Sequence, residues 1–206
     1  IVGAGYISAA YIKAAKNFSE LAIVSCADAQ RANAEKRGEE FGLKVQSVEE
    51  LLQDDSIDLV LNLTTPQGHF PVSSQGLQAG KHVYSEKPLA LNREEAEALA
   101  KMAREHHVRL GCAPDTFLGG GQQTARKLID DGAIGKPLGG TAFVLSAGPE
   151  GWHPSPEFYY QAGGGPVFDM GPYYITALVN LLGPVTQVTS IARRSFEERL
   201  FGVGPR

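Results

Sequence analysis

The chain opens with Ile1-Val2-Gly3-Ala4-Gly5-Tyr6-Ile7-Ser8, and this stretch decides how its first half folds. Two glycines stand between a short apolar strand and a helical pattern over residues 7–16. Gly3 permits a tight turn, and Gly5 lets the backbone approach a pyrophosphate closely. The helix that follows presents free N–H groups and the positive end of its dipole. We expect a dinucleotide to contact Gly3, Gly5, Tyr6 and Ile7.

Two further positions bear on this cradle. The third position of the fingerprint is Ser8, which is small but departs from the usual glycine or alanine. Asp28 ends the second predicted strand, where an acid accepts hydrogen bonds from the adenosine ribose hydroxyls. The alternative is that Asp28 caps the helix beginning at Arg31. The acid favours NAD as the cofactor, and Arg31 leaves NADP possible.

Residues 1–114 alternate β-rich runs with helical ones. Strands are predicted over 21–27, 57–64, 82–85 and 108–112, and helices over 7–16, 31–41, 71–79 and 93–106, with a short turn after Ser47. Asn92 and Glu95 form a capping-box pattern ahead of the last helix. The run 57–64 is apolar on both faces, which suits a parallel sheet covered by helices on both sides. The alternation predicts an α/β Rossmann domain with a doubly wound sheet.

The pattern changes near Pro114, and we expect a second domain over residues 115–206. It reads as helix 121–131, strand 140–146, a loop 147–164 rich in Gly, Pro and aromatics, helix 168–182 and strand 185–192. This order predicts an α+β domain with an open, mainly antiparallel sheet. Only two residues precede the first glycine, although a strand needs about five, and residues 201–206 are turn-like. We therefore expect a fragment whose C-terminal domain is incomplete.

Composition narrows the class of protein. The chain has 206 residues, 43% of them hydrophobic, and a formal net charge of −4. Basic residues are scattered, so nucleic acid is not an expected partner, and no apolar run reaches the roughly 18 residues of a membrane span. Cys26 and Cys112 lie in apolar runs and read as reduced thiols, with a disulfide or metal site the less favoured alternative. We expect a cytoplasmic protein without a metal.

Two loops should lie at the carboxyl edge of the sheet, where ligands bind in such folds. Thr64, Thr65 and Pro66 follow the strand 57–64, and we expect them to line the cofactor; a proline turn that starts the next helix explains Pro66 equally well. His69 is either a cofactor contact or a solvated residue at the start of that helix.

Glu86-Lys87-Pro88 follows the next strand. The proline keeps Lys87 extended and can hold a cis bond that aims the lysine into the crevice. A surface Glu–Lys pair is the alternative. Because the turn should lie beside the nicotinamide, we expect Glu86 and Lys87 to contact the cofactor and Lys87 to be catalytic.

Residues 163–173 read GGGPVFDMGPY and place Asp169 and Tyr173 four residues apart on one expected helix face. The glycines would let the chain approach a ligand closely. Oxidation of an alcohol releases the hydroxyl proton, and Tyr173 takes it if a cation such as Lys87 lowers the phenol pKa from about 10. Asp169 would hold the lysine or a substrate hydroxyl. The alternative makes Asp169 a helix cap and Tyr173 a core aromatic.

Four segments together are recognisable: IVGAGYIS (1–8), TTPQGHFPV (64–72), AGKHVYSEKPLA (79–90) and GGGPVFDMGPYY (163–174). In this order they resemble the Gfo/Idh/MocA family of NAD(P)-dependent oxidoreductases. The resemblance assigns the family's lysine to Lys87 and its aspartate to Asp169. At the position where the inositol dehydrogenase branch has its acid/base histidine, this sequence has Tyr173. In this it is similar to the branches of the family that use a tyrosine there. The resemblance also implies a homo-oligomer formed through the C-terminal sheet.

The loop 147–164 should supply the substrate site. Trp152, His153 and Tyr160 suit a polyhydroxylated ring, with packing of the loop as the alternative, and Asp115 is a weaker candidate. We expect hydride transfer between nicotinamide and a ring alcohol of a sugar, cyclitol or related polyol. The family also contains NAD-dependent glycosidases without net redox change and non-catalytic NAD(P)-binding sensors, which are the alternatives.

Overall fold

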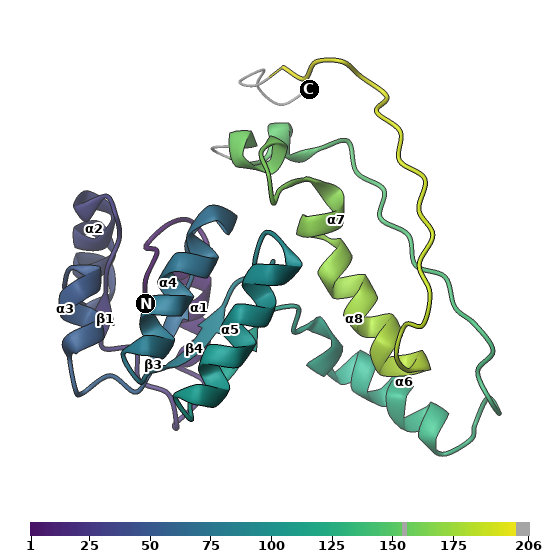
Figure 1. The fold of residues 1–206 in the computed structure, drawn as a ribbon, viewed down its shortest axis with the longest axis horizontal. Helices are drawn as coiled ribbons and strands as arrows, with labels where there is room; N and C mark the ends of the chain where they lie inside the picture. The colour runs from purple at the N-terminus through teal and green to yellow at the C-terminus, as the bar shows by residue number, and fades with distance from the viewer. Residues whose placement is uncertain (154–155, 201–206) are drawn as a thin grey trace. The chain divides into compact units, whose positions relative to one another are not determined.

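The structure is a computed structural model that describes residues 1–153 and 156–200 (Figure 1). The chain divides into two compact units, Ile1–Ala113 and Pro114–Arg206, which are described separately. The turn-like end expected at 201–206 and two residues of the expected loop 147–164 lie outside the described residues. No helix in the described part is long and apolar enough to cross a membrane.

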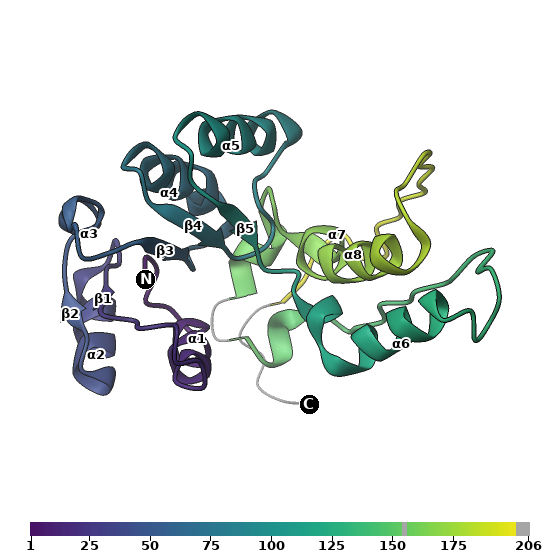
Figure 2. The same cartoon turned by 90° about the horizontal axis from the view of Figure 1, so that it is seen from below.

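The first unit alternates strands and helices. Its strands are β1 (Ser25–Cys26), β2 (Lys44–Val45), β3 (Leu59–Asn62), β4 (His82–Ser85) and β5 (Leu110–Cys112). Its helices are α1 (Ser8–Ala15), α2 (Arg31–Phe41), α3 (Val48–Gln53), α4 (Pro66–Gln78) and α5 (Arg93–Glu105). Figure 2 shows α4 and α5 on one side of the strands and α1 and α2 on the other.

All strand pairs of this unit are parallel. β1 pairs with β2, and β3, β4 and β5 pair in that order. Val2 joins the two groups, because it forms parallel bridges with both Ala27 and Asn62. The spatial order is therefore β2-β1-Val2-β3-β4-β5, with the chain running outward from the centre in both directions. The predicted α/β class with a doubly wound parallel sheet is confirmed.

The core consists of one apolar layer on each face of this sheet. One layer includes Val60, Leu77, Val83 and Leu99, each at most 1% exposed. The other is built around Ile12 with further residues of α1, α2 and the first strands. Each fully buried aliphatic side chain contributes about 2 kcal/mol of transfer free energy. Val60 packs into the first layer and Leu61 partly into the second, which accounts for apolar residues on both faces of β3, while Leu59 at its start is 41% exposed.

Side chains at the helix starts agree only partly with the sequence. A complete capping box forms at Ser47, whose hydroxyl accepts from Glu50 N at 3.0 Å while Glu50 Oε2 accepts from Ser47 N at 2.8 Å. Asn92 caps α5 by accepting from Glu95 N at 2.8 Å. The Glu95 carboxylate, however, accepts from Leu91 N at 3.1 Å and not from Asn92 N, so the predicted box at Asn92 is only half formed.

Helix α4 begins at Pro66, and the predicted start at residue 71 is wrong. Pro66 stands in the first turn of the helix, where a missing N–H costs nothing and the fixed φ is already helical. Pro71 lies inside the helix. Residues 66–70, which we expected to precede the helix, therefore belong to α4, and His69 lies within the helix.

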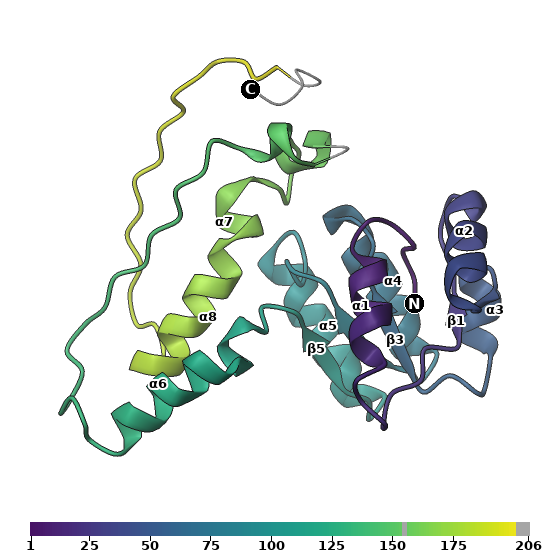
Figure 3. The same cartoon turned by 180° about the vertical axis from the view of Figure 1, so that it is seen from behind.

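The second unit contains helices α6 (Gly120–Asp130), α7 (Gly165–Asp169) and α8 (Gly171–Leu182) and the short 3-10 helices η1 (Thr116–Leu118), η2 (Pro149–Gly151) and η3 (Pro156–Tyr160). Figure 3 shows α8 following α7 and lying beside α6. Arg126 of α6 joins them, because its guanidinium donates to the Asn180 carbonyl at 2.8 Å near the end of α8. A cation at this position complements the negative end of the helix dipole.

The predicted antiparallel sheet is not confirmed. No strand is assigned in the described residues between 114 and 200, and the segments predicted as strands, 140–146 and 185–192, carry no strand pairing. Leu145 is 93% exposed and Ile191 is 98% exposed. Apolar, β-rich sequence becomes a strand only when another strand supplies hydrogen-bond partners, and among the described residues these two segments have none.

Candidate functional site

The expected cofactor-binding segments of the first unit lie along one edge of its parallel sheet. The glycine loop follows Val2, Asp28 follows β1, Thr64 follows β3 and Lys87 follows β4. Because the strands are parallel, all four segments leave the sheet at its carboxyl edge. Ligands bind at this edge in doubly wound sheets, beside the point where the strand order reverses.

The two glycines of the loop differ in what surrounds them. Gly3 has φ +98°, and a Cβ built on it would lie 2.5 Å from the carbonyl carbon and oxygen of Leu63. A Cβ on Gly5 would meet no protein atom within 4 Å. Gly3 therefore serves the protein's own packing, and Gly5 leaves open the space above the start of α1. That open space is where a pyrophosphate would lie, so the cradle fits a dinucleotide.

The placement of the Ser8 side chain explains how a serine is tolerated at the third position of the fingerprint. Its side chain is fully buried, and its hydroxyl donates to the Gly5 carbonyl at 2.7 Å. The serine is thus turned back onto the loop. Tyr6 and Ile7, in contrast, are 74% and 40% exposed on the outside of the turn.

Asp28 holds the glycine loop and the start of α2. Its Oδ2 accepts from Ala4 N at 2.8 Å, and its Oδ1 accepts from Gln30 N at 2.8 Å and Asn33 Nδ2 at 3.2 Å. Asp28 is therefore bonded to residues at the start of α2 but is not its cap, because the N-cap is Gln30, whose side chain makes no capping hydrogen bond. Contact of the same carboxylate with a ribose stays a prediction, and carboxylate oxygens have lone pairs for further donors.

Arg37, which was not among the predicted site residues, contacts the glycine loop. From α2 its Nη2 donates to the Gly5 carbonyl at 3.1 Å, and its Nη1 pairs with Glu40 at 2.5 Å. A guanidinium at the glycine loop adds positive charge beside the expected pyrophosphate. Its only sequence signal is its place one and a half turns into the helix that follows Asp28.

Asn62 was also missed, although it organises the loop after β3. It is fully buried, its Nδ2 donates to the His69 carbonyl at 2.9 Å, and its Oδ1 accepts from the Thr64 hydroxyl at 2.7 Å. Thr64 therefore faces the protein. Thr65 is exposed and precedes Pro66, which is buried at the start of α4. A lone amide within the apolar run of β3 was the available signal.

The turn that carries Lys87 is fixed by Glu86. The Glu86 carboxylate accepts from the Tyr11 hydroxyl at 2.9 Å through Oε1 and from Lys87 N at 3.0 Å through Oε2. The Lys87–Pro88 peptide bond is cis. Tyr11, on α1, was not among the predicted site residues. Its hydroxyl ties the lysine turn to the helix whose start forms the cofactor cradle.

His69 lies in the interior at 1% exposure. Its Nδ1 is 2.5 Å from the Pro88 carbonyl oxygen and its Nε2 is 2.9 Å from the Thr64 carbonyl oxygen. Burial lowers the pKa of this imidazole, and its two carbonyl neighbours oppose that shift. The sequence alternative of a solvated histidine is wrong, because the ring lies beneath the loop surface.

In the second unit, the expected single helix over 168–182 is broken at Met170, which has φ −106°. Asp169 is the last residue of α7, and Tyr173 is in the first turn of α8. The premise that they share one continuous helix is therefore wrong. Pro172 explains the break, since it lacks an N–H and its ring would clash with the carbonyl four residues back.

The glycine run before α7 is required by the protein itself. A Cβ on Gly164 would lie 2.4 Å from the Tyr159 carbonyl oxygen, and Gly163 and Gly165 have φ of +84° and +83°. These glycines allow the chain to pass directly against the backbone of η3. Their expected role, close approach to a ligand, is not needed to explain them.

Three predicted substrate residues lie in the loop next to this run. The His153 ring makes edge contacts with Trp152 at 5.5 Å, Phe158 at 5.2 Å and Tyr159 at 5.3 Å between centroids. Trp152 is 63% exposed, so its ring has a face available to a ligand. The His153 ring is thus packed within the loop, as the alternative expected, while the Trp152 ring is exposed on its surface.

Tyr160 and Asp115 have other surroundings. Glu150 bonds the Tyr160 hydroxyl and pairs with Arg199 at 2.5 Å, and these partners lower the pKa of the Glu150 carboxyl to about 2. Burial and Glu150 raise the pKa of Tyr160. Asp115 is exposed and its carbonyl accepts the Leu118 N–H at the start of η1.

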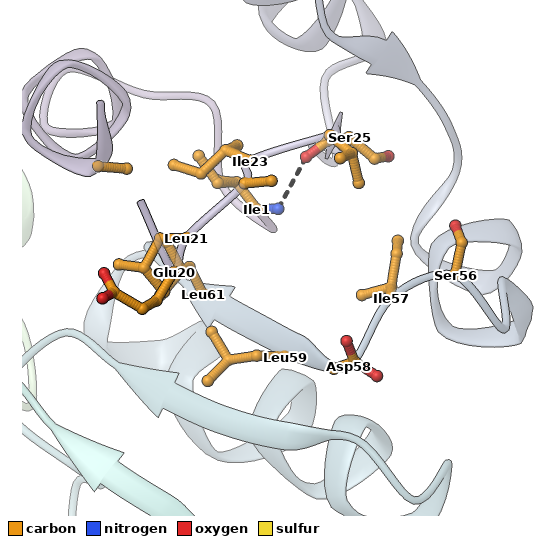
Figure 4. Close-up of a pocket in the computed structure, with 13 residues that line it drawn as sticks. Ile1, Glu20, Leu21, Ile23, Ser25, Ser56, Ile57, Asp58, Leu59 and Leu61 are labelled. Atoms are coloured by element: carbon orange, nitrogen blue, oxygen red, sulfur yellow. Dashed lines mark hydrogen bonds between the residues drawn. The ribbon is translucent and has the colours of Figure 1, made fainter. Parts of the chain in front are cut away.

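A cavity of about 360 Å³ lies elsewhere in the first unit (Figure 4). Ile1, Ser25, Asp58 and Leu59 are among its lining residues, and the Ile1 amino group donates to the Ser25 carbonyl at 2.8 Å within it. These residues stand at the amino ends of the strands. The cavity is therefore at the opposite edge of the sheet from the candidate site.

The glycine loop, the doubly wound sheet and the strand-end acid define the first unit as a Rossmann-type dinucleotide-binding domain. Residues 1–113 match the oxidoreductase family with an NAD-binding Rossmann fold, and residues 122–204 match the GFO/IDH/MocA C-terminal domain. The chain belongs to the Gfo/Idh/MocA oxidoreductase family, as its motifs predicted, and the first unit is its NAD(P)-binding domain.

Individual relatives agree with this assignment. The chain is 32% identical over 176 residues to 1,5-anhydro-D-fructose reductase of Ensifer adhaerens, which covers 82% of this chain and 52% of the relative. It is 29% identical to inositol 2-dehydrogenase of Rhizobium meliloti, covering 66% and 41%. A crystal structure from Sinorhizobium meliloti 1021 superposes with a TM-score of 0.75 at 27% identity, covering 88% and 54%. The chain spans about half the length of the curated relatives it matches.

Proposed function

We propose that the protein is an NAD(P)-dependent oxidoreductase that transfers hydride between nicotinamide and a ring alcohol of a sugar, cyclitol or related polyol. One observation carries the proposal: the glycine loop, the Thr64 loop and the Lys87 turn leave the same carboxyl edge of one parallel sheet. The names of the relatives, a sugar reductase and an inositol dehydrogenase, support the substrate class.

NAD⁺, when bound, supplies the hydride acceptor. The protein then has to remove the proton of the substrate hydroxyl. In the proposed mechanism Tyr173 accepts this proton and Asp169 orients the hydroxyl. The Lys87 ammonium stabilises the phenolate, because a nearby cation lowers the pKa of a phenol from about 10.

Asp28 supports NAD as the preferred form of the cofactor. An acid at this strand end binds the 2′-hydroxyl of the adenosine ribose and repels a 2′-phosphate. Arg31, the nearby cation that would favour NADP, pairs instead with Glu35 at 2.9 Å. For the substrate we propose contacts from Trp152, His153, Tyr160 and Asp115. Assembly of copies through the C-terminal unit is also proposed.

The experiment is an absorbance assay at 340 nm on the whole protein, with NAD⁺ and a panel of aldoses and cyclitols. We expect a rise with one subset of the panel. Lys87→Ala should lower kcat by about 10²–10⁴-fold and leave NAD affinity unchanged. Lys101→Ala is the matched control, because Lys101 is 70% exposed on α5 and pairs only loosely with Glu105 at 3.6 Å. Tight NAD binding with no turnover on any substrate, or full turnover in Lys87→Ala, would refute the proposal.

A further inference from the structure

The ring of His69 spans two neighbouring loops of the candidate site. Its Nδ1 faces the Pro88 carbonyl at 2.5 Å, and its Nε2 faces the Thr64 carbonyl at 2.9 Å. Thr64 follows β3, and Pro88 follows β4, which is the next strand of the sheet. A single side chain of α4 is thus placed between the two strand-end loops that should flank the nicotinamide.

The ring is itself held in place and shielded. The backbone carbonyl of His69 accepts from Asn62 Nδ2 at 2.9 Å, and the side chain is 1% exposed. A ring so buried, with both nitrogens already at hydrogen-bond distance from carbonyl oxygens, has no atom left for a bound dinucleotide. His69 can therefore affect the site only by positioning the two loops that its ring contacts.

Two contacts, one from Glu86 and one from His69, fix the backbone around Lys87. On one side, Lys87 N donates to Glu86 Oε2 at 3.0 Å. On the other side, the carbonyl of the next residue, Pro88, faces the His69 ring. The lysine side chain therefore starts from a segment held at two successive points, which restricts where its ammonium can lie.

The protonation state of His69 bears on how many loops it holds. A neutral imidazole donates through one nitrogen, and an imidazolium donates through both. Burial favours the neutral ring, whereas the two carbonyls and the Glu86 carboxylate favour the cation and Lys87 opposes it. In either state, at least one loop carbonyl receives a hydrogen bond from the ring.

We propose that His69 is a positioning residue for Lys87, holding the lysine-bearing turn against the Thr64 loop so that the ammonium lies at the reacting hydroxyl. This assignment rests on the proposed catalytic role of Lys87. It replaces direct cofactor contact as the reason for a histidine at this point of the chain.

The test compares His69→Gln with His82→Gln in the whole protein. His82 is a matched control, because its Nδ1 accepts a backbone N–H, that of Arg109, at 2.9 Å at the amino end of β4, away from the site. In His69→Gln we expect kcat to fall about 10–100-fold, as for other residues that orient a catalytic group. NAD affinity should stay within about threefold. If Lys87 lowers the pKa of Tyr173 as proposed, the acidic limb of the kcat pH profile, where the base Tyr173 must lose its proton, should move to higher pH in this variant.

Two results would overturn the proposal: a kcat for His69→Gln no lower than that of His82→Gln, or an NAD affinity that falls well beyond threefold, as loss of a direct cofactor contact would cause. Failure of the proposed function is a separate outcome, since Lys87→Ala would then keep full turnover or the unaltered protein would have none.

A measurement on the unaltered protein serves if His69→Gln does not fold or no substrate is found. In ¹⁵N NMR spectra of the five histidines, we expect one ring with a hydrogen-bonded N–H that exchanges slowly and whose shifts stay constant as NAD is added. The proposal is wrong if the ring N–H protons of all five histidines exchange rapidly with water. It is also wrong if the ¹⁵N shifts of the slowly exchanging ring change on NAD binding, as they would for a direct contact.

Discussion

Replacing Gly3 by alanine should destabilise the first unit without any ligand being involved. The added methyl group would lie 2.5 Å from the carbonyl carbon and oxygen of Leu63 and 2.7 Å from Thr64 N. All three are backbone atoms at the end of β3, so no side chain can rotate away. The backbone at Gly3 also has φ +98°, a region that residues with a Cβ rarely adopt.

The two costs can be estimated separately. A residue with a Cβ in left-handed backbone costs about 1–2 kcal/mol. Carbon contacts are favourable at about 3.5–4.0 Å, so the two chain segments must separate by about 1 Å, and such overpacking costs about 1–3 kcal/mol. Together these predict a loss of about 2–5 kcal/mol, against a total of about 5–15 kcal/mol for a native protein.

Gly5→Ala is the matched variant, since the new methyl group would meet no protein atom within 4 Å. We expect its free energy of unfolding to change by less than about 1 kcal/mol. NAD binding should weaken about 10–100-fold, because the methyl group occupies the space through which the backbone approaches the pyrophosphate.

Urea unfolding at 25 °C and calorimetric titration with NAD⁺ measure the two effects independently. Gly3→Ala should lose stability, and Gly5→Ala should keep stability and lose affinity. A Gly3→Ala variant as stable as the parent would show that the contact with Leu63 is relieved at no cost. A Gly5→Ala variant that binds NAD⁺ normally would mean that the open space above the helix start is not the pyrophosphate position.

Two further predictions concern ionisable groups. Arg199 and Tyr160 lower the pKa of Glu150 to about 2, so the stability it contributes is complete above its ordinary value of about 4.5 and is lost as the pH falls from there to about 2. Fluorescence of Trp152, the single tryptophan, should report this loosening in the parent and show no such transition in Glu150→Gln; identical titrations would contradict the ion pair. Burial raises the pKa of Cys112 to about 11, so its thiol should resist iodoacetamide at pH 8 in the folded protein and react after unfolding; rapid alkylation of the folded protein would show that the thiol is accessible.

The sequence predicted the first unit well because local signals and topology agree there. The helix over 31–41 and the strand over 82–85 have the predicted bounds. The parallel sheet follows from the alternation of strands and helices. The start of α4 failed because two prolines, Pro66 and Pro71, offer the same local signal, and only tertiary packing shows that both stand in one helix.

The second unit was harder to predict because its elements depend on partners distant in sequence. Apolar β-rich runs at 140–146 and 185–192 are not paired in the described structure. The break at Met170 follows from Pro172, and the spacing of Asp169 and Tyr173 alone does not reveal it. Periodicity alone cannot show that a helix is interrupted.

At the site, sequence indicates which residue types are present and not which of their atoms are already used. Asp28 and Glu86 were expected to face the cofactor, and each carboxylate accepts a backbone N–H of a site loop, that of Ala4 and that of Lys87 respectively. Tyr11, whose hydroxyl donates to Glu86, carries no motif and is recognisable only once the fold brings α1 to this edge of the sheet. Asn62, which holds the Thr64 loop, shows in the sequence only as a lone amide within an apolar run.

These carboxylates couple cofactor choice to loop geometry. A substitution such as Asp28→Ser, intended to admit the 2′-phosphate of NADP, would also remove the acceptor that holds Ala4 N at 2.8 Å. An unpaired N–H in a partly buried turn costs about 1–3 kcal/mol, so the variant would bind both cofactors less tightly before any preference changed. Asp28→Asn keeps a carbonyl oxygen for Ala4 N and removes the negative charge, while its amide nitrogen replaces the oxygen that accepts from Gln30 N and Asn33 Nδ2. The loss that Asp28→Ser shows in addition to that of Asp28→Asn therefore measures what the acceptor for Ala4 N does for the glycine loop.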